Sequence, residues 1–274
     1  MAKFYFLIEK IYKYFFRTII GYLLKIIFKK KKIKFSKLGS DYGSWCFLNL
    51  DNLFNSIIIS CGSGEDISFD IEFINKFKLK IILLDPTPRA IDYFELVKKS
   101  FGSKKKQGYT NDGKQKISSY DLTEITSQDL ILIPKAIWIE NLNQKKFFSP
   151  KNKKHVSYSF NDFSNDYRKD SDFIKVETIT YDNVIRDNSI NSLPLIKLDI
   201  EGSETSVIED ILEHRILPDQ ILVEFDELTT YELKAIYKYY RLHKKMLRKG
   251  YISVDVNNFS NQLYVKSSCL EKLH

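Results

Sequence analysis

The hydrophobic pattern divides the body of the chain into alternating strands and helices. Runs rich in β-branched or other apolar residues predict buried strands over residues 57–61, 81–84 and 220–225, and a further strand over residues 195–201. Between the first two runs, apolar residues recur at helical spacing over residues 67–77. Strands that alternate with helices in this way predict an α/β domain built on a mostly parallel sheet.

The pattern is less regular in four other stretches. Residues 39–53 are polar and aromatic without a clear period, which predicts a loop or a short lead-in helix. Residues 131–139 predict a strand broken by Pro134. Residues 145–160 predict a hairpin or a lid over a site, and residues 176–184 predict a short strand followed by a turn.

A glycine-rich turn follows the first predicted strand. The turn reads Gly62-Ser63-Gly64, and the next strand ends at Asp85, about 20 residues later. A strand, a glycine turn, a helix and a second strand that ends in an acid form the nucleotide-binding βαβ unit. The glycines let the backbone approach a ligand, and the Asp85 carboxylate can accept hydrogen bonds from two ribose hydroxyls.

The residues around the helix start indicate which nucleotide this unit binds. A dinucleotide site needs a further glycine near position 67 and a helix N-terminus free to hold a pyrophosphate, but this chain has Ile67 there. Glu65 and Asp66 lie at the predicted helix start, where two carboxylates repel a pyrophosphate. They do not repel S-adenosylmethionine, which carries a sulfonium and an ammonium. The alternative is that these two acids only cap the helix and complement its dipole.

A second charged motif ends another predicted strand. Lys197, Asp199 and Glu201 alternate along one side of the run that begins at Leu195. Burying three charges at the carboxyl end of a strand is costly unless they pair with one another or bind something. In open α/β sheets, ligands bind at that end. Two interpretations stay open: a ligand site, or a structural network between Lys197 and the carboxylates.

Net charge is distributed unevenly along the chain. The whole chain carries +8, while residues 1–40 contain ten Lys and one Arg against a single Glu, so the remaining residues carry a net −2. A body that is not basic argues against a nucleic-acid partner. The three cysteines and four histidines have no spacing typical of metal ligands or disulfides. We therefore expect no metal site, no structural zinc and a reducing compartment.

Residues 3–32 form an amphipathic segment. Five cations fall within an arc of about 120° on a helical wheel, and aliphatic and aromatic side chains face away from them. The longest uncharged stretch, residues 18–24, is shorter than the ~20 residues that span a bilayer. Binding to an anionic membrane surface through residues 1–32 and packing of this helix on its own domain both stay open. We expect a basic N-terminal helix over residues 1–40 and one domain over residues 41–274.

Three motifs resemble those of a known enzyme family. They are Ser60-Cys61-Gly62-Ser63-Gly64-Glu65-Asp66-Ile67-Ser68-Phe69-Asp70, then Asp85-Pro86-Thr87-Pro88-Arg89, then Lys197-Leu198-Asp199-Ile200-Glu201-Gly202-Ser203-Glu204. In these motifs the sequence resembles the FkbM family of S-adenosylmethionine-dependent methyltransferases, over about residues 55–265. Many family members have an acid before the first glycine, where this chain has Ser60 or Cys61.

The resemblance implies a class I methyltransferase Rossmann-like fold. This fold is a mostly parallel seven-stranded sheet with a C-terminal antiparallel hairpin, here expected at residues 251–256 and 262–266. The implied cofactor is S-adenosylmethionine, and the implied reaction is O-methylation of a hydroxyl on a sugar, glycan or related metabolite. The resemblance says nothing about residues 1–40. From the cysteine usage we expect a cytoplasmic protein, and if residues 1–32 bind a membrane it would be peripheral at the inner face.

The resemblance also implies roles for individual residues. The cofactor-binding residues would come from the first two motifs: Ser60, Gly62, Gly64, Glu65, Asp66, Asp85 and Pro86. Asp199 is the first candidate for the general base, with Glu201 and His155 as alternatives.

Two other functions stay open. An NAD-dependent sugar-modifying enzyme would share the βαβ unit, but Ile67 and the acids at the helix start argue against it. A methyltransferase-like module that has lost its activity could serve as a membrane-bound interaction partner. The presence of both Asp85 and Asp199 argues against that alternative.

Overall fold

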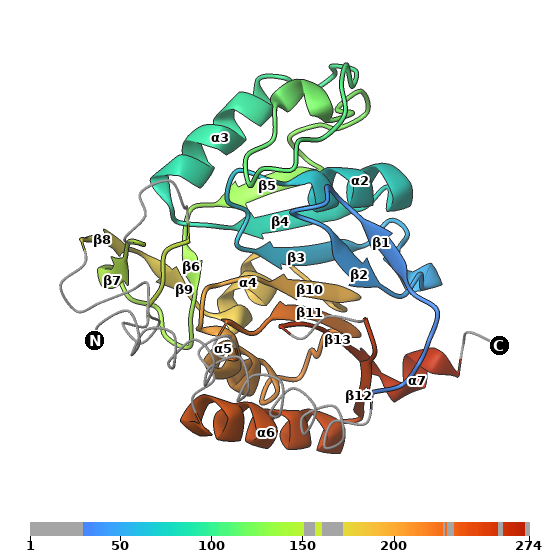
Figure 1. Cartoon of the computed structure of the whole chain (residues 1–274), viewed down its shortest axis with the longest axis vertical. Coiled ribbons are helices and arrows are strands. Elements are labelled where there is room, and N and C mark those ends of the chain that lie inside the picture. Colours follow the sequence, from blue (N-terminus) through green and yellow to red (C-terminus); the bar gives the residue numbers. More distant parts are fainter. Residues whose placement is uncertain are drawn as a thin grey trace, which may run out of the picture.

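The computed structural model describes residues 30–150, 157–160, 172–226, 228, 233–256 and 260–271. It confirms the expected mixed α/β class with a large, mostly parallel sheet (Figure 1). From one edge to the other, the strands of this sheet are β12 (Tyr251–Val254), β13 (Asn261–Lys266), β11 (Gln220–Glu224), β10 (Leu195–Leu198), β3 (Ile57–Cys61), β4 (Lys80–Leu84) and β5 (Leu130–Ile133). β13 is antiparallel to both of its neighbours, and all other neighbouring strands of the sheet pair in parallel.

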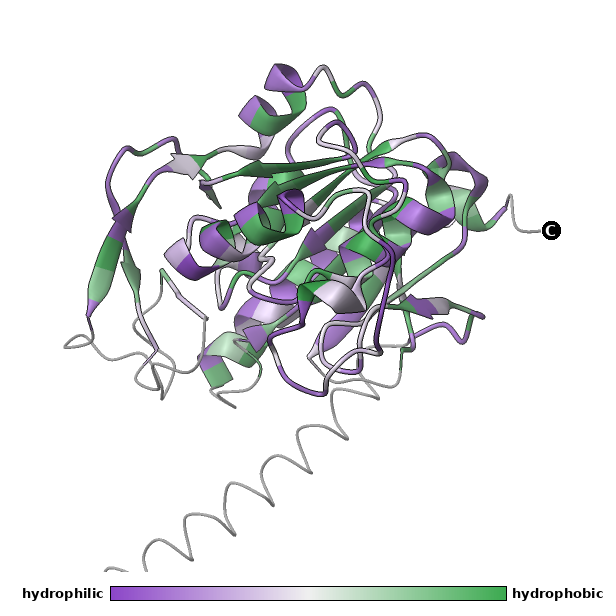
Figure 2. Cartoon of the chain, turned by 90° about the horizontal axis from the view of Figure 1, so that it is seen from above, coloured by the Kyte–Doolittle hydropathy of each residue, from purple (hydrophilic) through white to green (hydrophobic). Residues whose placement is uncertain are grey.

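The two faces of the sheet pack against different helices. α2 (Ser68–Phe77) and α3 (Pro88–Lys98) cover one face, and α4 (Tyr181–Asp187), α5 (Glu204–Ile211) and α6 (Leu233–Arg248) cover the other. Successive residues of β3 alternate between the layers, because Ile58 packs with the α2 side and Ile59 with the α5 side. Burial on both faces explains the continuous hydrophobic runs of the sequence, which Figure 2 shows on the central strands.

α4 is a helix that the sequence pattern did not predict. It follows β9 (Thr178–Ile179) and occupies residues expected to form a turn, so that expectation is wrong. The Thr180 hydroxyl accepts a hydrogen bond from the Asn183 backbone N–H at 3.3 Å and caps the helix. Tyr181, Val184 and Ile185 form one buried face. Two turns of helix are too short to show a period in the sequence.

Three small sheets and short helices complete the described chain. β1 (Ser36–Leu38) pairs antiparallel with β2 (Trp45–Phe47). β2 lies in the stretch 39–53 that was expected to be a loop or a short lead-in helix, and the short helix η1 (Asp51–Leu53) ends that stretch. Pro134 separates β5 from β6 (Ala136–Ile137), as predicted, and β6 pairs in parallel with β9. The remaining short helices are η2 (Ile117–Ser119) and α7 (Ser267–Leu270).

The expected hairpin over residues 145–160 is only partly correct. β7 (Lys145–Phe148) pairs antiparallel with β8 (Phe173–Val176), and this hairpin projects from the body of the molecule (Figures 1 and 2). Among the described residues of 145–160, which are 145–150 and 157–160, Phe148 and Ser159 form an isolated antiparallel bridge. The partner strand of β7 therefore lies farther along the chain, and Ser157, Tyr158 and Phe160 line the cavity described below.

The N-terminal amphipathic helix stays a prediction, because residues 1–29 lie outside the described part of the chain. The description begins beside the edge strand β12. There the Lys31 N–H donates to the Ser253 carbonyl at 2.8 Å, and the Lys31 carbonyl accepts from the Asp255 N–H at 3.0 Å. Within the described ranges, no helix has both the length and the hydrophobicity to cross a membrane.

Candidate active site

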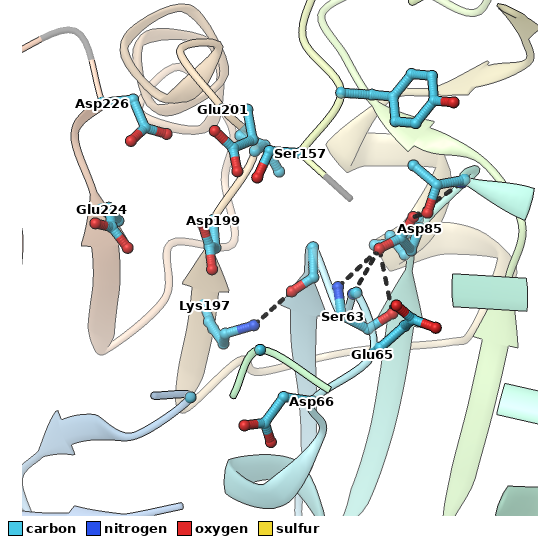
Figure 3. A pocket seen from close by; sticks show the side chains of 18 of the residues that line it. Ser63, Glu65, Asp66, Asp85, Ser157, Lys197, Asp199, Glu201, Glu224 and Asp226 are labelled. Carbon is cyan, nitrogen blue, oxygen red and sulfur yellow. Dashed lines mark hydrogen bonds between the residues drawn. The ribbon is translucent and has the colours of Figure 1, made fainter. Parts of the chain in front are cut away.

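The strand order reverses between β3 and β10, at the centre of the sheet. The chain runs outward from β3 to β4 and β5, and the later strands β10 and β11 lie on the other side of β3. In open α/β sheets, ligands bind beyond the carboxyl ends of the strands at such a reversal. A cavity of about 510 Å³ is found there, lined by Gly62 after β3 and by Asp199 after β10 (Figure 3).

Most of the predicted site residues line this one cavity. They are Gly62, Gly64, Glu65, Asp66, Asp85, Pro86, Asp199 and Glu201. Ser60 is fully buried within β3 and is not a lining residue, so an effect of Ser60 on a cofactor would be indirect. His155 lies outside the described residues, and its role as an alternative base stays a prediction.

The glycine turn is held tightly against the end of β10. Gly62 has φ 79°, and a Cβ atom built on it would lie 1.8 Å from the Asp199 carbonyl oxygen. The Lys197 ammonium is buried beneath the turn and donates to the Gly62 carbonyl at 2.6 Å. It also lies 5.4 Å from the centre of the Trp45 ring. Lys197 therefore joins β10 to the turn through a backbone carbonyl, and both interpretations of the charged motif stay open.

Asp85 organises the same turn from the end of β4. One oxygen accepts from the backbone N–H groups of Ser63 and Gly64 at 2.9 Å each and from the Ser63 hydroxyl at 3.3 Å. The other accepts from the Thr87 N–H at 2.9 Å and the Thr87 hydroxyl at 2.7 Å (Figure 3). A carboxylate offers about four lone-pair positions, so these five donors fill it. Thr87 directly precedes α3, but its hydroxyl donates to Asp85 and does not cap the helix.

Glu65 and Asp66 precede α2 and are both held by other parts of the chain. Glu65 is buried and pairs with Arg89 and with Lys114, the latter at 2.6 Å. Asp66 accepts from the Ser68 N–H at 2.9 Å, so it does satisfy the start of α2. Because two cations balance Glu65, its charge no longer supports the electrostatic argument against a pyrophosphate.

Four carboxylates meet on the opposite side of the cavity. Asp199 and Glu201 follow β10, and Glu224 and Asp226 lie at the end of β11 (Figure 3). One oxygen from each of Asp199, Glu201 and Asp226 lies within 4.8 Å of the other two. This spacing would suit a hard divalent cation such as calcium, whose oxygen ligands lie about 2.3–2.6 Å from the ion. The sequence reasoning assigned no metal ligands and gave no role to Glu224 or Asp226.

Burial raises the pKa of each carboxyl group in this cluster. Burial first, and the neighbouring Asp199 second, raise the pKa of both Glu201 and Glu224 to about 7. Burial and the Glu201 carboxylate raise the pKa of Asp226 still further. Burial also raises the pKa of Asp199, although the nearby Lys197 opposes this shift. Like charges this close cannot all stay ionised without a proton or a cation to compensate them.

The loop after β10 directs Glu201 into the cavity. Glu201 and Gly202 both adopt positive φ, 54° and 92°. The Glu204 carboxylate holds this conformation by accepting from the N–H groups of Ile200 at 3.0 Å and Gly202 at 3.1 Å. The Ser159 hydroxyl donates to the Glu201 carbonyl at 2.5 Å. A left-handed glutamate costs conformational energy, and such positions concentrate at functional sites.

Aromatic side chains form another wall of the cavity. They are Tyr42, Trp45, Phe69, Phe147, Tyr158 and Phe160. Phe147 of β7 lies 4.7 Å from Phe160, ring centre to ring centre, and 5.6 Å from Tyr158. The stretch predicted to be a hairpin or lid therefore does border the site. Tyr42 and Trp45 belong to the stretch that the sequence pattern left as a loop.

Together, the sheet order and the cavity at its reversal are compatible with a methyltransferase-like α/β fold. Residues 128–253 match the family model of the methyltransferase FkbM domain. The match confirms the resemblance to the FkbM family that the motifs carry. The matched residues include β10, β11 and the four carboxylates, whereas the glycine turn lies before them in the sequence. No curated protein and no solved structure matches the chain.

Proposed function

We propose that the protein transfers a methyl group from S-adenosylmethionine to a hydroxyl of a sugar, glycan or related metabolite. The observation that carries this proposal is that one cavity joins the glycine turn to the carboxylate cluster. Its volume of about 510 Å³ is in the range typical of small-molecule sites. The family match supports methyl transfer in general, and the acceptor is our proposal.

The residues that follow β3 and β4 form the first half of the cavity, and they fit the cofactor. Gly62 and Gly64 line this half of the cavity, where a nucleoside could lie against their backbone, and Asp85 is placed to bind a ribose. Since five donors already fill the Asp85 carboxylate, ribose hydroxyls would take the positions of the Ser63 and Thr87 hydroxyls. The acidic lining suits the positive sulfonium and ammonium groups, and the bound cofactor supplies the methyl group as an electrophile.

The carboxylates at the ends of β10 and β11 form the second half of the cavity, and they fit deprotonation of the acceptor. Methyl transfer is an in-line displacement: the C–O bond forms as the C–S bond breaks, and a neutral thioether leaves. The acceptor hydroxyl gives its proton to a carboxylate. Glu201, with its pKa raised to about 7, is well matched to this role at neutral pH, and Asp199 lies beside it. We therefore favour Glu201 as the base over Asp199.

The two alternative functions differ in what they require. Arg89 and Lys114 balance the charge of Glu65, so this residue would not repel the pyrophosphate of NAD. Ile67 still stands where a dinucleotide site has its third glycine, which argues against an NAD-dependent enzyme. A module without activity would not need four carboxylates to be held together against their mutual repulsion.

Calorimetric titration of the full-length protein with S-adenosylmethionine and with NAD tests the cofactor. We expect S-adenosylmethionine to bind at least tenfold more tightly than NAD. Tighter binding of NAD would overturn the proposal, and binding of neither would favour the inactive module. Transfer of labelled methyl groups from S-adenosylmethionine into a glycan extract then tests the acceptor class.

We also propose that residues 1–32 attach the enzyme to the inner face of a membrane. The support is the sequence: the positive charge is concentrated in this segment, and an apolar face lies opposite its cations. An enzyme held there would meet a lipid-linked acceptor, such as a glycan intermediate.

A further inference from the structure

The outward face of α6 combines exposed apolar side chains with cations. Between Leu233 and Arg248 this helix has six basic residues and no Asp or Glu. Its inner face is buried and consists of Tyr239, Leu242, His243 and Met246. At about 100° per residue, the opposite face is an arc of about 140° that is turned away from the sheet. α6 lies along the lower border of the molecule in Figure 1.

Apolar and basic side chains alternate within this outward arc. Its large apolar or aromatic residues are exposed to an unusual degree: Leu233 at 70%, Tyr237 at 62%, Leu247 at 40% and Tyr240 at 37%. Its cations are Lys234, Arg241, Lys244 and Arg248. Tyr240 therefore belongs to the outer surface and not to the core.

The charge of this arc is not balanced by the described part of the protein. None of its four cations forms an ion pair with a residue within the described ranges. The side of α6 that faces α5 differs, because Lys245 and Lys249 pair there with Glu213 at 2.8 and 3.8 Å. The outward arc is therefore open to an anionic partner, while the inner flank is neutralised within the fold.

The basic N-terminal segment ends beside α6. Lys31 pairs with β12, the strand that directly follows α6. Burial, with Lys244 and then Lys30 adding to it, lowers the pKa of His243 on α6 to about 4, so the charge of Lys30 acts on this helix. The chain therefore enters the described structure at the same edge of the molecule that carries the outward arc.

We propose that the outward face of α6 binds an anionic lipid surface next to the N-terminal segment and orients the enzyme on it. Cations at the rim of an exposed apolar and aromatic surface suit the interface of an anionic bilayer. The N-terminal segment itself is a poor occupant, because it is basic as well. A nucleic acid would use the cations but not Leu233 and Leu247.

This placement also relates the membrane to the active site. α6 leads from the carboxyl end of β11 back toward the start of β12, and β12 and β11 run in the same direction. The Leu233 end of α6 thus lies at the edge of the sheet where the cavity opens. A surface that is bound along α6 would lie close to the entrance for an acceptor. The surface contact itself does not depend on which reaction the cavity catalyses.

Flotation of the full-length protein with phosphatidylcholine vesicles, with and without phosphatidylglycerol, tests this proposal. The variant K234Q/R241Q/K244Q/R248Q removes the four outward cations. We expect it to bind the anionic vesicles at least tenfold more weakly, since each cation near such a surface contributes roughly fivefold. The matched control is K98Q/K99Q/K104Q/K106Q, which removes four exposed cations near α3, at the opposite border in Figure 1. The control should bind within twofold of the unsubstituted protein.

Two further variants measure contributions other than that of the α6 cations. One removes apolar side chains of α6, and the other removes cations of the N-terminal segment. L233S/L247S should weaken binding severalfold without changing its salt dependence, because it removes apolar contact only. K3Q/K10Q/K13Q/R17Q should add its loss to that of the α6 variant. Circular dichroism melts check that each variant folds, and all the substituted α6 side chains are exposed.

Three outcomes would overturn the proposal. The α6 variant could bind anionic vesicles as tightly as the unsubstituted protein, whatever the N-terminal variant does. The control could lose as much binding as the α6 variant, which would leave only an effect of net charge. The protein could bind a single-stranded RNA oligonucleotide through α6 at physiological salt and fail to bind vesicles, which would assign the surface to nucleic acid.

Discussion

The two halves of the cavity differ in what surrounds their carboxylates. Around β3 and β4, donors from the chain surround each carboxylate: five reach Asp85, and two cations reach Glu65. Around β10 and β11, carboxylates surround one another, and burial with mutual repulsion raises the pKa values of Glu201 and Asp226. In the first half, groups of the chain itself compensate the carboxylate charge. In the second half, a ligand, a proton or a cation has to compensate it.

This difference indicates where the chemistry takes place. A saturated set of hydrogen bonds makes the glycine turn rigid and preorganised for a bound nucleotide. A cluster of carboxylates with raised pKa values lowers stability and persists where function requires it. Removing a carboxylate should therefore damage the fold in the first half, and spare or even stabilise it in the second.

The largest expected effect is on turnover, in the second half of the cavity. Glu201→Gln removes the proposed base but keeps the shape of the side chain, so methyl transfer should fall by roughly 10²–10⁴-fold. Affinity for S-adenosylmethionine should change less than threefold. Labelled methyl transfer into a glycan extract and calorimetry measure the two quantities. Glu124→Gln, at an exposed position, serves as the control. Turnover within threefold of the unsubstituted protein would remove Glu201 from the mechanism.

The next effect is on the contact between the two halves. Gly62→Ala places a methyl group 1.8 Å from the Asp199 carbonyl oxygen, in a left-handed backbone conformation. We expect the free energy of unfolding to fall by roughly 2–4 kcal/mol in urea titrations. Gly108→Ala is the matched control, because a Cβ atom there meets nothing within 4 Å. Equal stability of the two variants would mean that the close contact between Gly62 and the Asp199 carbonyl does not constrain the turn.

Local patterns predicted the parallel sheet and the glycine turn, since both depend on residues close together in the sequence. The buried strands have continuous hydrophobic runs, and the turn carries its glycines in sequence. The position of Asp199 beside Gly62 also follows from the strand order, because Cys61 pairs with Leu198 in the sheet. A resemblance to known motifs added the cofactor and the candidate base.

The charge balance of the site could not be predicted in the same way. Glu65 is neutralised by Lys114, 49 residues away in the least regular part of the sequence. Glu224 meets Asp199 because of the register between β10 and β11, in which Leu198 pairs with Val223. The sequence does contain a signal for this meeting: Glu224-Phe225-Asp226 alternates like Asp199-Ile200-Glu201, at the end of a neighbouring strand.

Asp85→Asn should test the saturated half. An amide cannot replace both carboxylate oxygens, so at least one of the Ser63, Gly64 or Thr87 donors loses its buried acceptor. We expect a loss of about 2–3 kcal/mol in the free energy of unfolding, and at least tenfold weaker binding of S-adenosylmethionine. Asp121→Asn is the matched control, since Asp121 binds the Thr123 N–H and hydroxyl in the same way at an exposed site. The control should cost less than about 1 kcal/mol. If Asp85→Asn costs no more than the control, the turn is not organised by that carboxylate.

The smallest effect is the pH dependence of stability that the carboxylates of the second half contribute. The folded pKa of Glu224 is raised from its ordinary 4.5 to about 7, so between these values the folded state holds a proton that the unfolded state has released. The unfolded state binds fewer protons in this window, and stability therefore falls as pH rises through it. Glu224→Gln removes this term. In chemical denaturation it should unfold with a shallower pH slope than the unsubstituted protein, and be about 1 kcal/mol more stable near pH 8. Asp85→Asn should lower stability at both ends of the window. If the stability difference between Glu224→Gln and the unsubstituted protein does not change between about pH 5 and pH 8, Glu224 holds no raised pKa, and the contrast between the halves disappears.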